Sequence, residues 1–502
     1  MTSVLPQGWA TSSLGDIFEI LDSLRKPINA DERATRRGDV PYYGATGQVG
    51  WIDEFLFDEE LILLGEDGAP FLDSNKPKAY VIRGKSWVNN HAHVLRAPSS
   101  TPSSFWKLQL DTVAYKSFVS GTTRLKLPQG SMKQIQLLVP PCKEQHRLSD
   151  ILDSYLSRLD NAVRSLESVQ VKLRAYRASV LKAAVEGRLV PPEAALARAE
   201  KRDYEPADAL LARILKERRR RWEEAELTRL KTNGKTPKDD KWKTKYQEPE
   251  APDTSKLPHL PKGWCWTSLS SVIVDGPQNG IYVPKTQYGE GTPILRIDDY
   301  QVNWSRSSSE LQRVKLSVDD EARFGLSVGD LVLNRVNSPS HLGKTLAVEA
   351  RHLPAVFESN MMRFRVGSGL APRFLHFYLS APQGKQRLTA GAKWAVNQAS
   401  INQKDVGNAV VPLPPASEQV RLVAEIDRLL SAAVVAAATV EQDASRAVRL
   451  RQAVLKWAFE GKLVDQDPND EHAEKLLARI RAERAAVNPV KKTFARRARA
   501  AA

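Results

Sequence analysis

Two long stretches of the chain carry apolar side chains at spacings that alternate between four and three residues. This alternation is typical of the a and d positions of a coiled-coil helix. The first predicted seam consists of Leu148, Leu152, Tyr155, Leu159, Ala162, Leu166, Val169, Leu173, Tyr176 and Val180. The second consists of Leu422, Ile426, Leu429, Ala433, Ala436, Val440, Asp443, Ala447, Leu450 and Val454. Because the first seam is bulky and the second is rich in alanine, we expect the two helices to pack against each other.

The two predicted helices are also copies of each other in sequence. "VPPCKEQHRL" from Val139 returns 274 residues later as "LPPASEQVRL", and "VLKAAVEGRLV" from Val180 returns at the same offset as "VLKWAFEGKLV". The double prolines stop an extended run before each helix, and Gly187 and Gly461 stand where a helix would end. We therefore predict two helices of about 44 residues. Each must return the chain toward the next globule, so the pair should be antiparallel.

Further duplicated motifs show that the whole chain is a tandem repeat. "LPQGW" from Leu5 returns 255 residues later as "LPKGW", and "LLARILKER" from Leu210 returns 266 residues later as "LLARIRAER". Between the repeated anchors, "ELILLGEDGAP" and "GDLVLNRVNS" are typical of buried strands that run into polar loops. "APRFLHFYLSAPQGKQRL" is typical of an amphipathic helix. The predicted fold class is α+β, with two mixed globules separated by a long antiparallel two-helix coiled coil and related by a pseudo-twofold repeat.

The charge and the loops of the chain favour a polyanionic partner. The formal net charge is +15 and the isoelectric point is near 9.6, which is most often a sign of nucleic-acid binding. The predicted loop tips are rich in amides, glycines and basic residues, which suit base edges and phosphates. In the first globule the candidate DNA-contacting residues are Tyr42, Tyr43, Thr46, Glu66, Asp67, Asn89, Asn90, His91, Thr122, Thr123, Arg124 and Lys126. In the second they are Asn279, Lys285, Arg296, Arg335, Asn337, Lys344, Lys393, Trp394, Asn397 and Gln398.

The sequence contains no recognisable catalytic or metal-binding motif. "HLGKT" from His341 resembles the end of a phosphate-binding loop, but Ser338 stands where the first glycine is required. His91 and His93 have no carboxylate or cysteine partner at metal-ligand spacing. No glycine-rich dinucleotide fingerprint and no methyl-transfer motif occurs. We therefore expect no catalytic residue, no metal and no cofactor in this chain.

At this point the motifs resemble a known family. "YYGATGQVGWIDEF", "ILLGEDGA", "WVNNHAHVL", "NQASINQKDVGNAVVPLPP" and the duplicated anchors are similar to the specificity subunits of bacterial type I restriction–modification enzymes, over essentially the whole chain. The resemblance implies two target-recognition domains, each reading half of a split double-stranded DNA sequence. It implies docking of two methyltransferase (M) subunits and recruitment of restriction–translocase (R) subunits. S-adenosylmethionine, ATP and magnesium would then belong to the partners, and the location would be cytoplasmic.

The predicted division of the chain follows from the repeat and from this resemblance. The target-recognition domains should span 1–138 and 259–412, and the coiled-coil helices 139–190 and 413–464. A linker with a charged helix, 191–258, and a C-terminal helix with a basic tail, 465–502, complete the chain. Two alternatives remain open, namely an enzyme that modifies DNA alone and a coiled-coil scaffold without a DNA role. The missing motifs disfavour the enzyme, and the charge and loop composition disfavour the scaffold.

Overall fold

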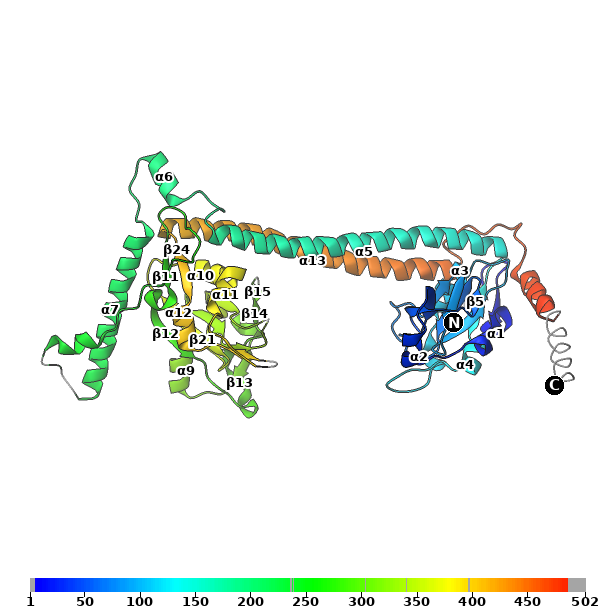
Figure 1. Cartoon of the computed structure of the whole chain (residues 1–502), viewed down its shortest axis with the longest axis horizontal. Coiled ribbons are helices and arrows are strands. Elements are labelled where there is room, and N and C mark those ends of the chain that lie inside the picture. Colours follow the sequence, from blue (N-terminus) through cyan, green and yellow to red (C-terminus); the bar gives the residue numbers. More distant parts are fainter. Residues whose placement is uncertain are drawn as a thin grey trace. The chain divides into compact units, whose positions relative to one another are not determined.

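The computed structural model describes residues 5–234, 237, 239–302, 304–339, 341–395 and 398–485. The chain divides into two compact units, here called unit 1 (residues 1–167 and 441–502) and unit 2 (residues 168–440). Two long helices, α5 (Cys142–Val185) and α13 (Ala416–Phe459), contribute to both units. Figure 1 draws α5 in cyan and α13 in orange.

The globule of unit 1 contains two four-stranded sheets and a separate strand pair. β1 (Ala10–Ser13) pairs antiparallel with β10 (Gln136–Val139). The first sheet has the order β2–β9–β6–β7, with bounds Glu19–Ile20, Ala92–Arg96, Leu61–Gly65 and Ala79–Ile82. The second has the order β4–β3–β8–β5, with bounds Gln48–Ile52, Val40–Tyr43, Lys85–Val88 and Phe57–Asp58. The short helices are α1 (Leu14–Ile17), α2 (Ala30–Thr35), α3 (Ser103–Thr112) and α4 (Gln129–Lys133).

Unit 2 repeats this plan with additional elements. β11 (Cys265–Ser268) pairs antiparallel with β24 (Val410–Leu413). The main sheet has the order β12–β21–β17–β19, with bounds Ile273–Asn279, Met361–Val366, Leu331–Asn334 and Thr345–Ala347. Smaller sheets are β16–β13–β20 (Gln312–Val314, Tyr288–Leu295, Val356–Phe357), β18–β23–β22 (Val336–Asn337, Ala399–Ser400, Lys393–Trp394) and β14–β15 (Tyr300–Gln301, Trp304–Ser305). The helices are α6 (Glu193–Glu200), α7 (Ala207–Thr232), α8 (Leu269–Val272), α9 (Val318–Phe324), α10 (Pro372–Ser380), α11 (Pro382–Leu388) and α12 (Gln403–Asn408).

The main sheets of the two units have the same topology, although the globules align poorly in sequence. In both, the first strand lies beside the last, and the last lies beside the second. A parallel strand pair also recurs, β3 with β8 in unit 1 and β13 with β20 in unit 2. Both predicted buried strands are present, as β6 and β17. The predicted amphipathic helix from Ala371 is two helices instead of one, because the chain breaks at Ala381 before Pro382, whose ring cannot continue a helix.

The lengths and ends of the two long helices agree with the prediction. Each helix has 44 residues and starts directly after the double proline. Gly187 and Gly461 follow the ends with φ of 66° and 67°. The Gly187 N–H donates to Ala184 O and the next N–H donates to Ala183 O, which is a Schellman cap, and the end of α13 repeats both bonds.

The duplicated motifs meet one another in each unit. In unit 1 the Trp9 indole Nε1 donates to Glu144 at 3.0 Å, and a Cβ on Gly461 would lie 2.4 Å from the ring of Pro6. In unit 2 Trp264 Nε1 donates to Glu418 at 2.9 Å, and a Cβ on Gly187 would lie 2.3 Å from Pro261. Each unit therefore joins the start of one long helix to the end of the other through its own "LPxGW" segment.

The helix that carries the duplicated "LLARI" segment packs on the "LPxGW" segment in each unit. In unit 2 the Ala207 N–H at the start of α7 donates to Gly263 O at 2.8 Å, and Leu210 and Ile214 are buried in the core. In unit 1 the Ala473 N–H donates to Gly8 O at 2.9 Å, and the helix that includes residues 473–485 buries Leu476 and Ile480. The duplicated "LLARI" segment is thus an apolar helix face in both units, and the basic tail from Pro489 lies outside the described residues.

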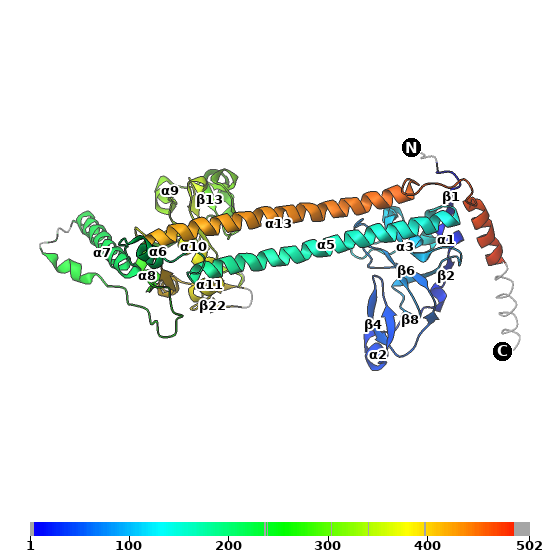
Figure 2. The same ribbon diagram turned by 90° about the horizontal axis from the view of Figure 1, so that it is seen from above.

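Within each unit the two long helices pack antiparallel, as Figure 2 shows for their cyan and orange segments. In unit 1 Arg451 of α13 bonds to Asp160 of α5 at 2.6 Å. Further along α5, in unit 2, Arg177 donates to the carbonyl of Ala433, which comes earlier in α13. Residue numbers therefore increase along α5 where they decrease along the facing α13, as in an antiparallel pair.

Every second residue of the predicted seam is in the helix interface. At the positions between these, the residue in the interface is the one directly after the predicted residue. Leu152 and Ile426 are fully buried, Val440 is 7% exposed, and Leu159, Leu166, Leu173 and Leu429 are half-buried. Leu450, by contrast, is 44% exposed and Tyr155 is 46% exposed. The more buried positions of α5 are Leu152, Leu156, Leu159, Val163, Leu166, Gln170, Leu173, Arg177 and Val180. The apolar Tyr155, Val169 and Tyr176 favoured the wrong phase, because polar Gln170 and Arg177 occupy two true seam positions.

None of the described helices combines the length and the apolar character that crossing a lipid bilayer requires.

Candidate functional site

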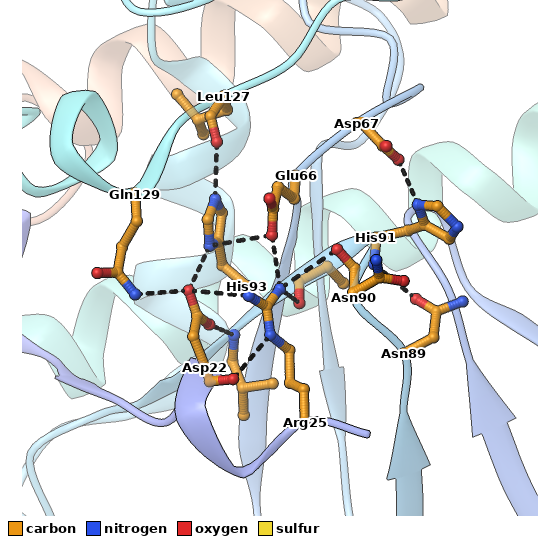
Figure 3. Close-up of polar contacts among 12 residues, drawn as sticks. Asp22, Arg25, Glu66, Asp67, Asn89, Asn90, His91, His93, Leu127 and Gln129 are labelled. Carbon is orange, nitrogen blue, oxygen red and sulfur yellow. Dashed lines mark hydrogen bonds and ion pairs between the residues drawn. The ribbon is translucent and has the colours of Figure 1, made fainter. Parts of the chain in front are cut away.

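In unit 1, three segments that are far apart in sequence meet at one end of the main sheet. They are the loop after β6 (Gly65–Gly68), the loop between β8 and β9 (Asn89–His91), and residues 122–127. The Glu66 N–H donates to His91 O at 2.8 Å, and the Leu127 N–H donates to Glu66 O at 2.7 Å. Main-chain bonds therefore hold most of the first globule's candidate residues within one surface. Figure 3 shows Glu66, Asp67, Asn89, Asn90 and His91 among them.

The side chains of this surface form ion pairs between the three segments. Asp67 accepts from Arg124 at 3.0 Å and lies 2.7 Å from His91 Nδ1. Glu66 lies 3.2 Å from Lys126 Nζ. The candidates Asn90, Thr122, Thr123, Arg124 and Lys126 are exposed, and His91 is half-exposed. This surface offers hydroxyl, amide and cationic donors around two carboxylates that are already paired.

A buried network that the sequence did not reveal lies directly beneath this surface (Figure 3). Arg25 Nη1 donates to Glu66 at 2.6 Å and to Ala92 O at 2.7 Å. His93 lies 2.6 Å from Asp22 through Nδ1 and 2.8 Å from Leu127 O through Nε2. Because a carbonyl only accepts, Nε2 carries a proton, and the Asp22 carboxylate faces the other ring nitrogen. Arg25 and Asp22 stand in an ordinary-looking segment, "ILDSLRKP", so no sequence signal could have found them.

The electrostatics of this network favour an ionised Asp22. Burial by itself raises the pKa of Asp22, but the hydrogen bond and charge of His93, the Val94 N–H and the Gln129 amide together bring the pKa below its ordinary value. The ligand atoms of Asp22, Glu66 and His93 lie within 4.8 Å of one another, a spacing that a metal ion could use. The Arg25 guanidinium already bonds to Glu66 and pairs with Asp22 at 3.5 Å, so the carboxylates are neutralised by a side chain.

Two candidates of unit 1 predicted on the surface lie in the interior instead. Tyr42 is 1% exposed and donates its hydroxyl to Ile28 O at 3.3 Å, so it belongs to the core of the second sheet. Asn89 is 7% exposed, and its Oδ1 accepts the His91 N–H at 2.8 Å, which fixes the loop that carries Asn90 and His91. Alternation along a half-buried strand sends every second side chain inward, and the sequence did not fix that phase. Tyr43 is half-buried and Thr46 is exposed.

Unit 2 repeats the main-chain bonds of this surface with different side chains. The Arg335 N–H donates to Asn360 O at 2.9 Å, and the Ile401 N–H donates to Arg335 O at 2.9 Å. These bonds match those of Glu66 with His91 and Leu127. Arg335 therefore occupies the backbone position of Glu66, and Asn360 that of His91.

The short sheet β18–β23–β22 brings further second-globule candidates beside Arg335. Val336 and Asn337 pair with Ser400 and Ala399, and β22 continues the sheet with Lys393 and Trp394. Trp394 is 62% exposed, and Lys393 and Gln398 are also exposed. Asn397 lies outside the described residues. The structure thus joins Arg335, Asn337, Lys393, Trp394 and Gln398 in one surface.

The remaining candidates of unit 2 lie at the margin of this surface or are tied to the backbone. Asn279 is exposed, and the next N–H, of Gly280, bonds to Met361 O beside Asn360. Lys285 is exposed in a separate turn. Arg296 bonds to Gln312 at 2.8 Å. Lys344 donates to Ile297 O at 2.5 Å, and burial lowers the pKa of its ammonium, so it supports a loop instead of facing solvent.

The comparisons with known proteins agree on one family. Residues 6–169 match the family model described as type I restriction modification DNA specificity domain. The EcoDI specificity subunit of Escherichia coli is 23% identical over 96% of both chains, and the EcoKI specificity subunit of Escherichia coli K12 is 24% identical over 76% of this chain and 71% of that one. Residues 6–169 thus belong to this family of DNA specificity domains, and nearly the whole chain is similar to type I restriction enzyme specificity subunits. The description of the matched domain assigns it to DNA recognition.

The fold of this chain is also that of a solved structure. A chain from a structure of the type I R-M system superposes with a TM-score of 0.58 at 16% identity, covering 92% of this chain and all of that one. The likeness shows a common fold of two domains and a coiled coil.

Proposed function

We propose that each unit of this specificity subunit reads one half of an asymmetric, bipartite double-stranded DNA site. The long helices set the length of the unread spacer and dock two M subunits, and R subunits join the complex. The chain itself is non-catalytic, binds no metal or cofactor, and acts in the cytoplasm. S-adenosylmethionine, ATP and magnesium serve the partner subunits.

The observation that carries this proposal is the pair of matched surfaces with different side chains. Glu66 and Arg335 occupy one backbone position, and His91 and Asn360 occupy another, as their main-chain bonds show. At one position an imidazole in unit 1 is replaced by an amide in unit 2, and at the other a carboxylate already paired with Arg25 and Lys126 is replaced by a guanidinium, so the two surfaces offer different hydrogen-bonding groups to base edges. One framework that carries unlike side chains should therefore read two unlike half-sites. A scaffold without a DNA role gives no reason for exposed amides and cations at the same place in both units.

The outer faces of the long helices support the docking of helical partners. Side chains outside the seam remain exposed although they are apolar, among them Val171 at 57%, Val435 at 67% and Trp457 at 55%. Apolar side chains that a helix leaves exposed can be covered by a helical partner. We therefore assign the M-subunit contact to these helices and leave the loop surfaces for DNA.

The experiment that tests this proposal is an exchange of one globule. Residues 10–138 are replaced by the corresponding globule of another specificity subunit, and the chain is produced in cells with its M subunit. Mapping of methylated bases across the genome should show that one half of the site has changed and that the other half and the spacer are unchanged. The reciprocal exchange of residues 265–412 is the matched control and should change only the other half. A change in both halves, or in neither, would show that the units do not read independently.

A further inference from the structure

One side chain in the unit 2 surface stands out because its charge is not compensated. Arg335 lies between β17 and β18, with its N–H bonded to Asn360 O and its carbonyl bonded to the Ile401 N–H, both at 2.9 Å. Its Nη1 donates to Ser359 O at 3.1 Å. Its buried Nε has no hydrogen-bond partner, and no carboxylate pairs with its guanidinium anywhere in the described part of the chain.

The counterpart in unit 1 is fully engaged. Glu66 accepts from Arg25 at 2.6 Å and lies 3.2 Å from Lys126. Each of its two carboxylate oxygens is therefore paired with a cation inside the unit. The same backbone position therefore carries a carboxylate paired with two cations in unit 1 and a guanidinium without a carboxylate partner among the described residues in unit 2.

The surroundings of Arg335 suit a base edge better than a phosphate. Its neighbours in the surface are uncharged, namely Asn337 on β18 and Ser359 and Asn360 on the adjoining loop. The exposed Lys393 lies on β22, the far strand of the same short sheet, where a phosphate could be reached from the rim. Phosphate contacts position a protein on DNA, whereas contacts at the centre of the interface read bases. Arg335 is also half-buried, and the bond from its Nη1 to Ser359 O holds the guanidinium before DNA binds.

From this geometry we propose that Arg335 reads a guanine in the half-site that unit 2 contacts. The guanidinium presents parallel N–H donors that match the O6 and N7 acceptors of guanine in the major groove. Adenine offers a donor beside N7 and is rejected at this position. Unit 1 lacks this contact because Glu66 is already paired. This inference rests on the proposed function, since it names one base within a half-site.

The test replaces Arg335 in the full chain and maps methylated sites with the M subunits present. Arg335→Ala should relax one G·C pair in one half-site, with cognate binding weakened about 10- to 100-fold and binding to unrelated DNA unchanged. Arg335→Gln should shift the preference at that pair toward A·T, because a glutamine amide pairs with adenine N6 and N7. Arg335→Lys keeps the charge but loses the fork of donors, so it should also relax the G·C pair. Arg220→Ala is the matched control, because this arginine is exposed on α7 of the same unit, pairs with Glu224 and lies outside the surface of Arg335, so both half-sites should stay unchanged.

Three results would overturn the inference. Equal weakening on all sequences by Arg335→Ala, with a salt slope smaller by about one, would make Arg335 a phosphate contact. An unchanged site and affinity in all three variants would place Arg335 outside the interface. Relaxation in both half-sites together would indicate an indirect effect on folding. In each case the globule exchange would still report separately on whether the units read independent half-sites.

Discussion

At the scale of single residues, the loops that we propose for DNA contact are held by side chains buried beneath them. Arg25 bonds to Glu66 and to the carbonyl of Ala92, and His93 connects Asp22 to the carbonyl of Leu127. These bonds join all three segments of the unit 1 surface from below. The exposed candidates were predictable from loop composition, because amide and basic side chains are frequent at the tips of these loops. Asp22 and Arg25 were not, because only the folded chain brings them under the loops.

Asp22→Asn should destabilise unit 1 at neutral pH by about 3 kcal/mol, because it removes one partner of a buried charged pair. The folded pKa of Asp22 lies below the ordinary value of 3.8, so the stabilising effect is complete above that pH and is lost as the pH falls through the folded pKa. The difference between wild type and variant should therefore shrink below about pH 4. Urea unfolding curves of the wild type and of Asp22→Asn, recorded at pH 7 and at pH 3, measure the difference in unfolding free energy at each pH.

The control for this variant is Asp58→Asn, since Asp58 is exposed on β5. It should change the unfolding free energy by less than about 0.5 kcal/mol at either pH. Equal stability of Asp22→Asn and wild type at pH 7 would mean that Asp22 contributes nothing to holding the loops.

At the scale of elements, the ends of the long helices were predictable and their packing phase was not. A proline pair excludes helix before Cys142 and Ala416, and Gly187 and Gly461 adopt the positive φ that a helix end requires. Both signals are local, so one sequence is enough to find them. The phase of the seam depends on the partner helix, and Arg177 lies in the seam because Ala433 offers it a carbonyl. The shared topology of the globules could not be predicted from the sequence either. Main-chain hydrogen bonds define it, and they place few constraints on which side chains are present.

Adjacent residues on α5 provide a direct test of the corrected seam. Leu156 is 6% exposed and Tyr155 is 46% exposed. Leu156→Ala should lower the unfolding free energy of unit 1 by about 2–4 kcal/mol, since it removes a buried side chain and leaves a cavity. Tyr155→Ala should cost less than about 1 kcal/mol. Urea unfolding of the two variants distinguishes the phases, and a reversed order of the two losses would restore the seam that the sequence favoured.

At the scale of the whole molecule, three duplicated motifs form the same junction in each unit. In each unit the tryptophan of "LPxGW" bonds to the buried glutamate of "PPxxEQ", and burial raises the pKa of both Glu144 and Glu418. The proline of "LPxGW" packs against the glycine that ends the other long helix. The repeat therefore encodes a junction that fastens each globule to both helices, and a globule can vary without disturbing it. This division explains how recognition loops can differ between units while the helix length stays fixed.

If the helices set the proposed spacer between half-sites, a change in their length should change that spacer. An insertion of four residues lengthens a helix by about 6 Å and turns its face by about 40°. The register that places Asp160 beside Arg451 puts Leu166 opposite Ser445, so matched insertions belong after these two residues. DNA rises about 3.4 Å and turns about 35° per base pair. The added length corresponds to nearly two base pairs of DNA, and the added rotation corresponds to about one base pair. The spacer in the methylated site should therefore grow by one or two base pairs, with both half-sites unchanged. An insertion of two residues at the same points turns the seam by about 200° and should prevent assembly instead. Methylome mapping of the four-residue variant gives the answer, and full activity with an unchanged spacer would mean that the helices join the units without measuring the DNA.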